Sequence, residues 1–293
     1  MHYKRYKTIL SAKNGTNVGM NVYRGCSHGC IYCDGRSRCY RMEHDFEDIE
    51  VKEDAPALLE DELRRKRKRC MIGTGAMCDP YLHLEKTLCV TRRCLEVIRD
   101  CGFGLAIQTK STLLLRDLDL LCAIHKKAKC VVQFTLTTYD DALCRILEPH
   151  VSVTSERVEA LEILRAHGIP TVVWLSPVLP MINDTPENLN GILDACIRAG
   201  VKGILCFGFG VTLREGDRDY FYAKLDAHFP GMRERYAKKF GNAYACMSDR
   251  NAELTEIFRA RTARHGILNT PDAVFAYLHT FESPDAPEQM RMF

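Results

Sequence analysis

The sequence lacks long apolar runs, since no stretch approaches the ~20 apolar residues that a membrane-spanning helix needs. It also lacks low-complexity tracts and internal repeats of the solenoid type. The formal net charge of +3 is too small to indicate a particular partner. The first residues carry charge but no apolar signal core follows them, so we expect a cytoplasmic protein. With 293 residues, 46% of them hydrophobic, the chain is long enough for one large α/β domain.

The sequence also lacks the signs of a disulfide framework. Its 15 cysteines are odd in number and scattered along a long chain, which is typical of a protein kept in a reducing cytosol. Zinc-finger spacing is absent as well, because no second cysteine pair or histidine pair stands at the required distance. Each group of cysteines therefore needs its own interpretation.

One group of cysteines is closely spaced: Cys26, Cys30 and Cys33 form a C-x3-C-x2-C pattern, with Tyr32 just before the third. Three thiolates on one short loop can each ligate a different iron of a cubane iron–sulfur cluster. With only three protein ligands, one iron keeps an open position that can bind a small molecule. The spacing therefore predicts a cluster that serves chemistry as well as structure, with a zinc loop as the alternative.

The rest of the chain alternates between short apolar strands and amphipathic helices. After a first strand at 17–23, we predict strands at 70–73, 105–109, 131–137, 171–176 and 203–208. Helices are predicted at 57–68, 87–100, 117–125, 155–167 and 186–199. Alternating units of this kind build a parallel sheet with right-handed crossovers, and six strands suit an open, partial barrel.

Three parts of the chain are predicted. Residues 1–16 are polar and are expected to form a leader across the surface, and residues 17–210 form the α/β unit. Residues 211–293 are expected to form a helical extension packed on that unit, with helices at 217–229, 230–240, 251–265 and 271–280. We do not expect this extension to be an independent domain.

The strongest charge run, at 64–69, ends the first predicted helix. One interpretation is a nucleic-acid patch. The other is a solvated helix end whose cations complement the negative end of the helix dipole. In a parallel β/α barrel, helix C-termini lie at the face opposite the active site, so we favour the second interpretation.

Polar and glycine residues follow several predicted strands, where ligands of α/β sheets usually bind. A glycine backbone can approach a charged amino acid closely, and a lysine or arginine can pair with its carboxylate. The residues at these positions are Gly73, Thr74, Gly75, Cys78, Asp79 and Tyr81 after the second strand, Lys110 and Ser111 after the third, and Thr137, Glu148 and Arg157 after the fourth.

This ordered set resembles the spore photoproduct lyase-like branch of the radical S-adenosylmethionine (SAM) superfamily. The cysteine motif, Gly-Thr-Gly with Asp-Pro-Tyr, Thr-Lys-Ser, and Glu-Pro with a later Arg occur in that order, over residues 18–210. The resemblance implies a radical SAM enzyme with a partial (β/α)6 barrel and a helical C-terminal extension. It also implies a 4Fe-4S cluster, SAM, and an electron donor such as flavodoxin or ferredoxin.

The resemblance further implies that SAM is cleaved to a 5′-deoxyadenosyl radical, which abstracts hydrogen from a substrate. By this resemblance, Tyr32 would border the adenine of SAM. Lys110 and Arg157 would be candidates to pair with the methionine carboxylate, and Glu148 would support the site. The methionine amino end would be held by Gly73, Thr74 and Gly75. The full expectation is metal ligands Cys26, Cys30 and Cys33; cofactor-binding residues Tyr32, Gly73, Thr74, Gly75, Lys110, Ser111, Thr137, Glu148 and Arg157; and catalytic candidates Cys78, Asp79 and Tyr81.

Two departures leave the reaction open. Spore photoproduct lyases carry a hydrogen-donating cysteine after the second strand, where this chain has Ala76, and the nearest thiol is Cys78. They also have a tyrosine after the third cluster cysteine, where this chain has Asp34. A DNA-lesion lyase is therefore one alternative, and a non-catalytic iron–sulfur redox sensor is another. The substrate class (nucleic acid, metabolite or peptide) and the oligomeric state stay open.

Overall fold

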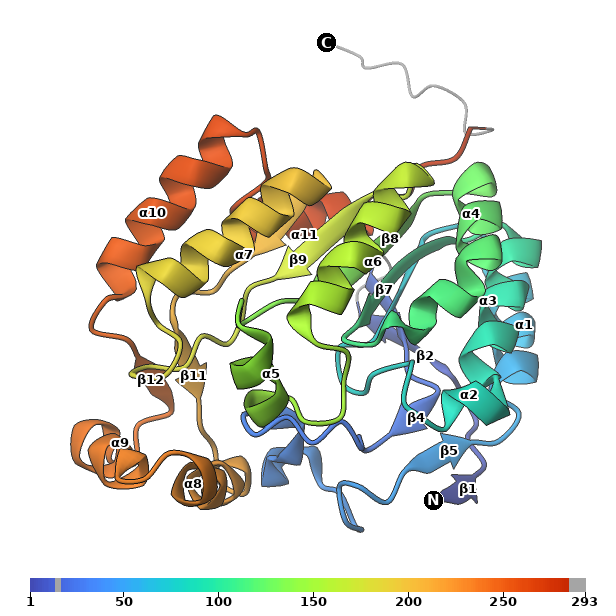
Figure 1. The fold of residues 1–293 in the computed structure, drawn as a ribbon. Helices are drawn as coiled ribbons and strands as arrows, with labels where there is room; N and C mark the ends of the chain where they lie inside the picture. The colour runs from blue at the N-terminus through green and yellow to red at the C-terminus, as the bar shows by residue number, and fades with distance from the viewer. Residues whose placement is uncertain (14–16, 285–293) are drawn as a thin grey trace.

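The computed structural model describes residues 1–13 and 17–284, and its centre is an open seven-stranded sheet (Figure 1). The strand order is β10-β9-β8-β7-β6-β3-β2, so β10 and β2 are the two edges. Six strands are parallel and β2 (Leu10–Lys13) pairs antiparallel with β3. The six are β3 (Asn17–Met20), β6 (Met71–Thr74), β7 (Gly104–Thr109), β8 (Cys130–Thr135), β9 (Thr171–Trp174) and β10 (Gly203–Leu205). The predicted partial barrel is confirmed.

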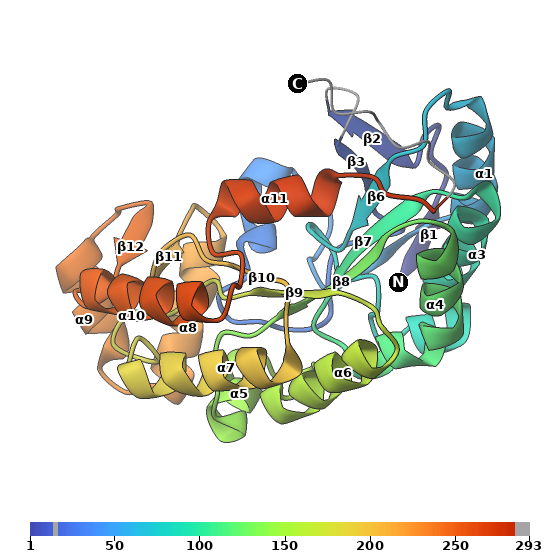
Figure 2. The same ribbon diagram turned by 90° about the horizontal axis from the view of Figure 1, so that it is seen from above.

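Helices cover the outer face of this sheet (Figure 2). Alternate strand residues such as Ile107, Val132 and Val173 pack with helix residues in the main core, because successive side chains of a strand point to opposite faces. The helices on this face are α1 (Ala55–Arg65), α3 (Val90–Cys101), α4 (Leu118–Lys127), α6 (Thr154–Ala166) and α7 (Pro186–Ala199). Shorter helical segments in the connecting loops are α2 (Glu85–Leu88), α5 (Asp141–Leu147), η1 (Asp34–Arg36), η2 (Arg38–Tyr40) and η3 (Thr112–Asp117).

The amino-terminal region contains more regular structure than the expected surface leader. Strand β1 (His2–Lys4) pairs parallel with β5 (Glu50–Lys52), which pairs antiparallel with β4 (Tyr23–Arg24). Strand β2 also falls in the region expected as a leader, while residues 14–16 lie outside the described residues. These strands are short and their partners are distant in sequence, so no local alternation predicted them.

The carboxy-terminal region is helical as predicted, with one addition. Its helices are α8 (Asp217–His228), α9 (Met232–Phe240), α10 (Asn251–Arg264) and α11 (Pro271–His279). The addition is an antiparallel pair, β11 (Gly210–Thr212) with β12 (Ala245–Met247). Within residues 1–13 and 17–284, no helix has the length and apolar character needed to cross a membrane.

The basic run at residues 64–69 lies where the topology of a parallel β/α unit predicts it. Helix α1 ends at Arg65 and β6 begins at Met71, so the run lies at the edge where strands begin. Arg64 and Arg65 pair with Glu60 and Asp61 one turn earlier on the exposed helix surface. The run is therefore at the edge opposite the strand ends that carry the candidate site.

Helix α11 packs on the inner face of the sheet, opposite the main helix layer (Figure 2). Val274 and Leu278 of this helix share a buried cluster with residues of five different strands. Those strand residues are Met71, Ala106, Val131, Val172 and Leu205. Helix α11 thus covers this part of the inner face of the sheet.

Replacing Leu278 with alanine is expected to lower the unfolding free energy by ~2–5 kcal/mol, because it leaves a cavity in this inner cluster. Leu278 is 3% exposed, so the site has no solvent to fill the space. Urea unfolding measures the change, and the exposed Ala276→Ser on the same helix is the control, expected within about 0.5 kcal/mol of wild type. Equal stability of the two variants would contradict this packing role.

Candidate active site

The cysteine loop follows β4 and is held from both sides by backbone hydrogen bonds. The amide of Cys26 donates to the carbonyl of Phe46 (2.9 Å), and the amide of Ile31 donates to Leu147 (2.9 Å). Gly25 has φ +85°, and an added Cβ would lie 2.6 Å from the Phe46 carbonyl oxygen. Glycine at position 25 therefore allows the loop to turn against its neighbour.

The three cluster cysteines line a small cavity of about 90 Å³. Burial raises the pKa of Cys26 to about 12, with the nearby Cys33 adding to the rise, and burial also raises the pKa of Cys30 and Cys33. In the described part of the chain, the donor atoms of the three cysteines do not all lie within 4.8 Å of one another.

The glycine loop after β6 lies against the next strand. Gly75 has φ +99°, and an added Cβ would lie 2.0 Å from the carbonyl oxygen of Gln108 on β7. The buried Thr74 Oγ1 has no hydrogen-bond partner among the described residues. Gly73 lies in β6, paired with Gly19 and Ala106 of the neighbouring strands. Gly75 also lines the small cavity, so the loop offers a bare backbone there.

Asp79 joins the loops that follow β6 and β7. Its carboxylate accepts from Thr109 Oγ1 (2.7 Å), from the amide of Lys110 (2.8 Å) and from the amide of Tyr81 (2.9 Å). The Nδ1 atom of His28 lies 3.5 Å from the same carboxylate. Asp79 thus positions these loops and also lines the small cavity, and its catalytic role stays a prediction.

Lys110 lines both the small cavity and a larger one beside it. Burial alone would lower its pKa, but the negative charges of Cys30, Glu148 and Asp79 together raise it. The ammonium therefore stays charged and faces the space between the cysteine loop and the sheet. The predicted position of Lys110 in the site is consistent with this geometry.

Glu148 and Arg157 form a fully buried ion pair rather than two separate cofactor contacts. Arg157 is 0% exposed, and its guanidinium donates to Glu148, to the carbonyl of Ser152 (2.7 Å) and to the carbonyl of Thr135 (2.7 Å). Glu148 also accepts from the hydroxyl of Tyr32. Burial opposes ionisation of Glu148, but Arg157 and Lys110 lower its pKa below the ordinary value.

This arrangement corrects the expectation that Arg157 pairs with a cofactor carboxylate. Its donors are taken up by protein acceptors, so its role is to hold Glu148 and the end of β8. Tyr81 needs the same correction, because its side chain is buried in the core and its hydroxyl donates to Asp117 (3.1 Å). Both residues point into the protein because neighbouring helices pack over them.

The remaining predicted residues take varied positions. Cys78 is buried beside the small cavity, and its thiol donates to the carbonyl of Gly25 (2.7 Å). Ser111 caps η3, where its Oγ accepts from the amide of Leu113 (3.3 Å). Thr137 is buried, its carbonyl accepts from Asn183, and its Oγ1 has no hydrogen-bond partner in the described part of the chain. The direct cofactor contacts of Ser111 and Thr137 stay predictions.

The larger cavity, about 340 Å³, contains side chains that the sequence did not single out. It shares Tyr32, Cys33 and Lys110 with the small cavity. Its apolar wall includes the single tryptophan, Trp174 on β9, whose indole N–H donates to Gln133 (2.8 Å). Other wall residues that we did not predict are Tyr40, Met77, Gln108, Ser176, Phe207 and Met247. Successive side chains of a strand point to opposite faces of a sheet, and this alternation along β9 was the sequence signal that could have identified Trp174 as a wall residue.

An open parallel sheet with a three-cysteine loop and a lysine at its carboxyl edge defines a class of partial-barrel α/β proteins. The sequence profile of the Radical SAM superfamily matches residues 20–194. The chain therefore belongs to the radical SAM superfamily. Membership implies a 4Fe-4S cluster and SAM as the superfamily's cofactors.

Relatives in sequence and structure agree with this assignment. An uncharacterised protein of Mycobacterium bovis is 31% identical over 227 residues, which cover 75% of this chain and 66% of the relative. An uncharacterised protein of Methanocaldococcus jannaschii is 31% identical over 172 residues, covering 58% of this chain and 63% of its own. The chain thus spans just under two thirds of the length of these relatives. A structure of spore photoproduct lyase complexed with dinucleoside spore photoproduct has a TM-score of 0.63 at 14% identity, covering 91% of this chain and 80% of its own, and so shares the fold.

Replacing Glu148 with glutamine is expected to lower the unfolding free energy at neutral pH by about 3–5 kcal/mol, because it leaves Arg157 buried without its anion. Chemical denaturation measures the loss. Glu162→Gln breaks the exposed pair with Arg198 and serves as the control, with an expected loss below about 1 kcal/mol.

The pH dependence of this loss follows from the lowered pKa of Glu148. The carboxylate stabilises the fold above the pKa of an unfolded glutamate, and this contribution disappears as the pH falls through the lower folded pKa. The difference between wild type and Glu148→Gln should therefore shrink in acid. A difference that stays constant or grows in acid would contradict the ionised pair.

Proposed function

We propose that this radical SAM enzyme cleaves SAM to a 5′-deoxyadenosyl radical, which abstracts hydrogen from a substrate held in the larger cavity. The observation that carries the proposal is the wall shared by the two cavities, which includes Tyr32, Cys33 and Lys110. A radical formed beside the cysteine loop has direct access to the larger space. When bound and reduced, the cluster supplies the electron that splits the sulfonium of SAM.

The residues around the small cavity fit these cofactors. Cys26, Cys30 and Cys33 would hold three irons and leave the fourth open. The Lys110 ammonium would pair with the methionine carboxylate of SAM, and the Gly75 backbone leaves room for its amino end. Arg157 would act through Glu148.

The larger cavity constrains the substrate only in its chemistry. Trp174, Phe207 and Met247 give it an apolar wall, while Gln108 and Thr135 supply neutral polar groups. Such a wall suits a flat or apolar group on a metabolite, a peptide or a nucleic acid. The electron for SAM cleavage would come from a small donor protein such as a flavodoxin or ferredoxin.

Hydrogen return by a thiol is not supported at the position expected for a lesion lyase. Ala76, which lines both cavities, has no thiol, and the thiol of Cys78 donates to the Gly25 carbonyl. Cys78 lies two residues further along and lines the small cavity. We therefore propose hydrogen abstraction, with the net reaction set by the substrate.

Anaerobic reconstitution is expected to load about four irons per chain, and dithionite with SAM should then give 5′-deoxyadenosine. Replacing Cys26, Cys30 and Cys33 together with alanine should abolish both cluster absorbance and nucleoside formation. The matched control replaces three partly buried cysteines elsewhere, Cys70, Cys89 and Cys101, and should keep both. A full iron load in the first triple variant would overturn the ligand assignment.

Replacing Lys110 with methionine is expected to weaken SAM binding roughly ten- to a hundred-fold at unchanged iron content. A hydrogen bond to a charged group contributes ~1.5–3 kcal/mol, and methionine removes the charge at similar length. Equilibrium dialysis of cluster-loaded protein measures the affinity, with the exposed Lys86→Met as control. Wild-type affinity in Lys110→Met would show that another group binds the carboxylate.

A further inference from the structure

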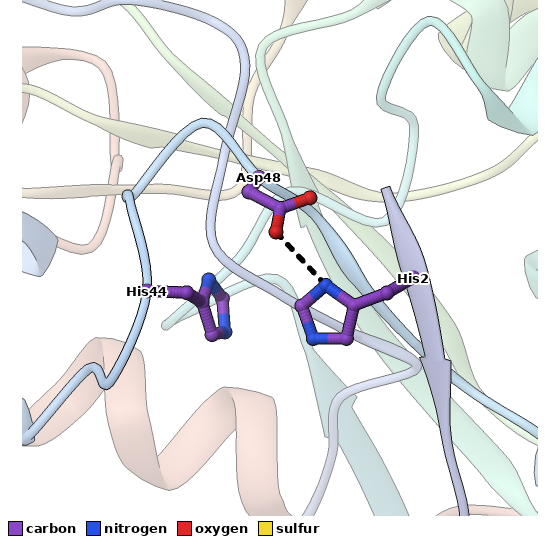
Figure 3. Close-up of side chains that lie close together, drawn as sticks. All are labelled: His2, His44 and Asp48. Atoms are coloured by element: carbon purple, nitrogen blue, oxygen red, sulfur yellow. Dashed lines mark hydrogen bonds and ion pairs between the residues drawn. The ribbon is translucent and has the colours of Figure 1, made fainter.

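A second cluster of metal-binding side chains lies at the amino-terminal sheet, away from the cysteine loop's cavity. His2 on β1, His44 in the loop before β5, and Asp48 offer donor atoms that all lie within 4.8 Å of one another (Figure 3). The parallel register of β1 and β5 places His2 beside Glu50, whose side chain is 1% exposed. The two imidazole rings are 4.7 Å apart and nearly perpendicular.

The hydrogen bonds of the two histidines leave one nitrogen of each ring available. His2 Nδ1 lies 3.0 Å from the Asp48 carboxylate (Figure 3), and His44 Nδ1 lies 3.0 Å from the Asp45 carbonyl oxygen. Both partners are acceptors, so each Nδ1 carries the proton and each Nε2 keeps its lone pair. Histidine ligands of metals are oriented by contacts of this kind, from a carboxylate or a backbone carbonyl to the second nitrogen.

The two Nε2 atoms converge on one carboxylate oxygen without bonding to it. Each lies 3.8 Å from Glu50 Oε2, which is too long for a hydrogen bond. The Nε2 of His44 is buried and has no hydrogen-bond partner in the described residues. Two ligands about 2.0–2.2 Å from a shared ion lie at most about 4.3 Å apart, so 3.8 Å is compatible with an ion between them.

We propose that this cluster is a binding site for a divalent ion of the zinc type. The ligands are Nε2 of His2, Nε2 of His44 and the Glu50 carboxylate. Asp48, the third member of the group within 4.8 Å, orients His2 through Nδ1 and is not itself a ligand. Imidazole and carboxylate donors without thiolates suit Zn²⁺, Co²⁺ or Ni²⁺ rather than the oxygen-preferring Ca²⁺ and Mg²⁺.

Two cations compete for the carboxylates and can move aside. The Lys4 ammonium is 3.4 Å from Glu50 Oε2, and the Met1 amine is 2.6 Å from Asp48 Oδ1. Both are more than 40% exposed, so water can solvate them once a metal arrives. The other oxygen of Glu50 accepts from Tyr6, which leaves Oε2 for the ion.

The site would connect the amino-terminal strand to the cysteine loop. His44 is two residues before Phe46, whose carbonyl accepts from the amide of Cys26 (2.9 Å). An ion bound by His2 and His44 therefore fixes the segment that supports the first cluster cysteine. Binding free energy of a metal that the unfolded chain does not hold adds to folding stability.

The test adds one equivalent of Zn²⁺ to the cluster-loaded full chain after removal of loosely bound metal by a mild chelator. Zinc content is measured after gel filtration, and zinc-edge X-ray absorption identifies the ligands beside the iron. We expect one zinc per chain, with nitrogen and oxygen ligands near 2.0–2.2 Å and no sulfur near 2.3 Å. Thermal unfolding should shift to higher temperature with zinc.

Matched variants separate a metal site from a structural effect. His44→Gln should lose zinc and its thermal shift, Asp48→Asn should bind ten- to a hundred-fold more weakly, and the exposed His228→Gln should match wild type. Lys4→Met, which removes a competing cation, should instead bind zinc more tightly. Zinc on sulfur alone, no retained zinc, or equal retention in His44→Gln would each overturn the proposal, whatever the enzyme's activity.

Discussion

The spacing between the cysteine loop and the sheet depends on one buried carboxylate. Glu148 accepts from Tyr32 of the cysteine loop and pairs with Arg157 of α6, and Arg157 in turn donates to the Thr135 carbonyl at the end of β8. A buried charge is stable only when its partners are in place, so these three segments are positioned together. Lys110 adds a second positive charge near the same carboxylate. The electrostatic balance of the site is therefore set inside the protein, before any cofactor binds.

Much of the fold was predictable because its units are local. Helix α7 has the predicted bounds, since Thr185 caps its start, Pro186 suits its first turn and Gly200 ends it in a left-handed conformation. The six parallel strands follow from the regular alternation of strand and helix. The pairs β1–β5 and β11–β12 were not predictable, because strands of three residues carry no periodic signal and their pairing depends on distant segments.

The candidate site was also predictable only in part. Cys26, Cys30, Cys33 and Lys110 come together because strand ends share one edge of a parallel sheet, which the order of the chain already indicates. The direction in which a side chain points is a property of packing, so the inward position of Arg157 and Tyr81 was not readable from their place after a strand. The wall of the larger cavity, which includes Trp174, depends on the curvature of the sheet. The convergence of His2 and His44 depends on the register between β1 and β5.

Because α11 follows every strand of the seven-stranded sheet in the chain, the inner face of the sheet lacks the apolar cover of this helix on a nascent chain until residues 271–279 have been synthesised. The cysteine loop emerges from the ribosome far earlier, while Val131, Val172 and Leu205 have no helix to pack against. Chains generally fold as whole units from their amino-terminal end, and this unit is complete only when its carboxy-terminal helix arrives. A chain that ends before residue 271 would therefore expose the apolar inner face of the sheet, including Val131, Val172 and Leu205.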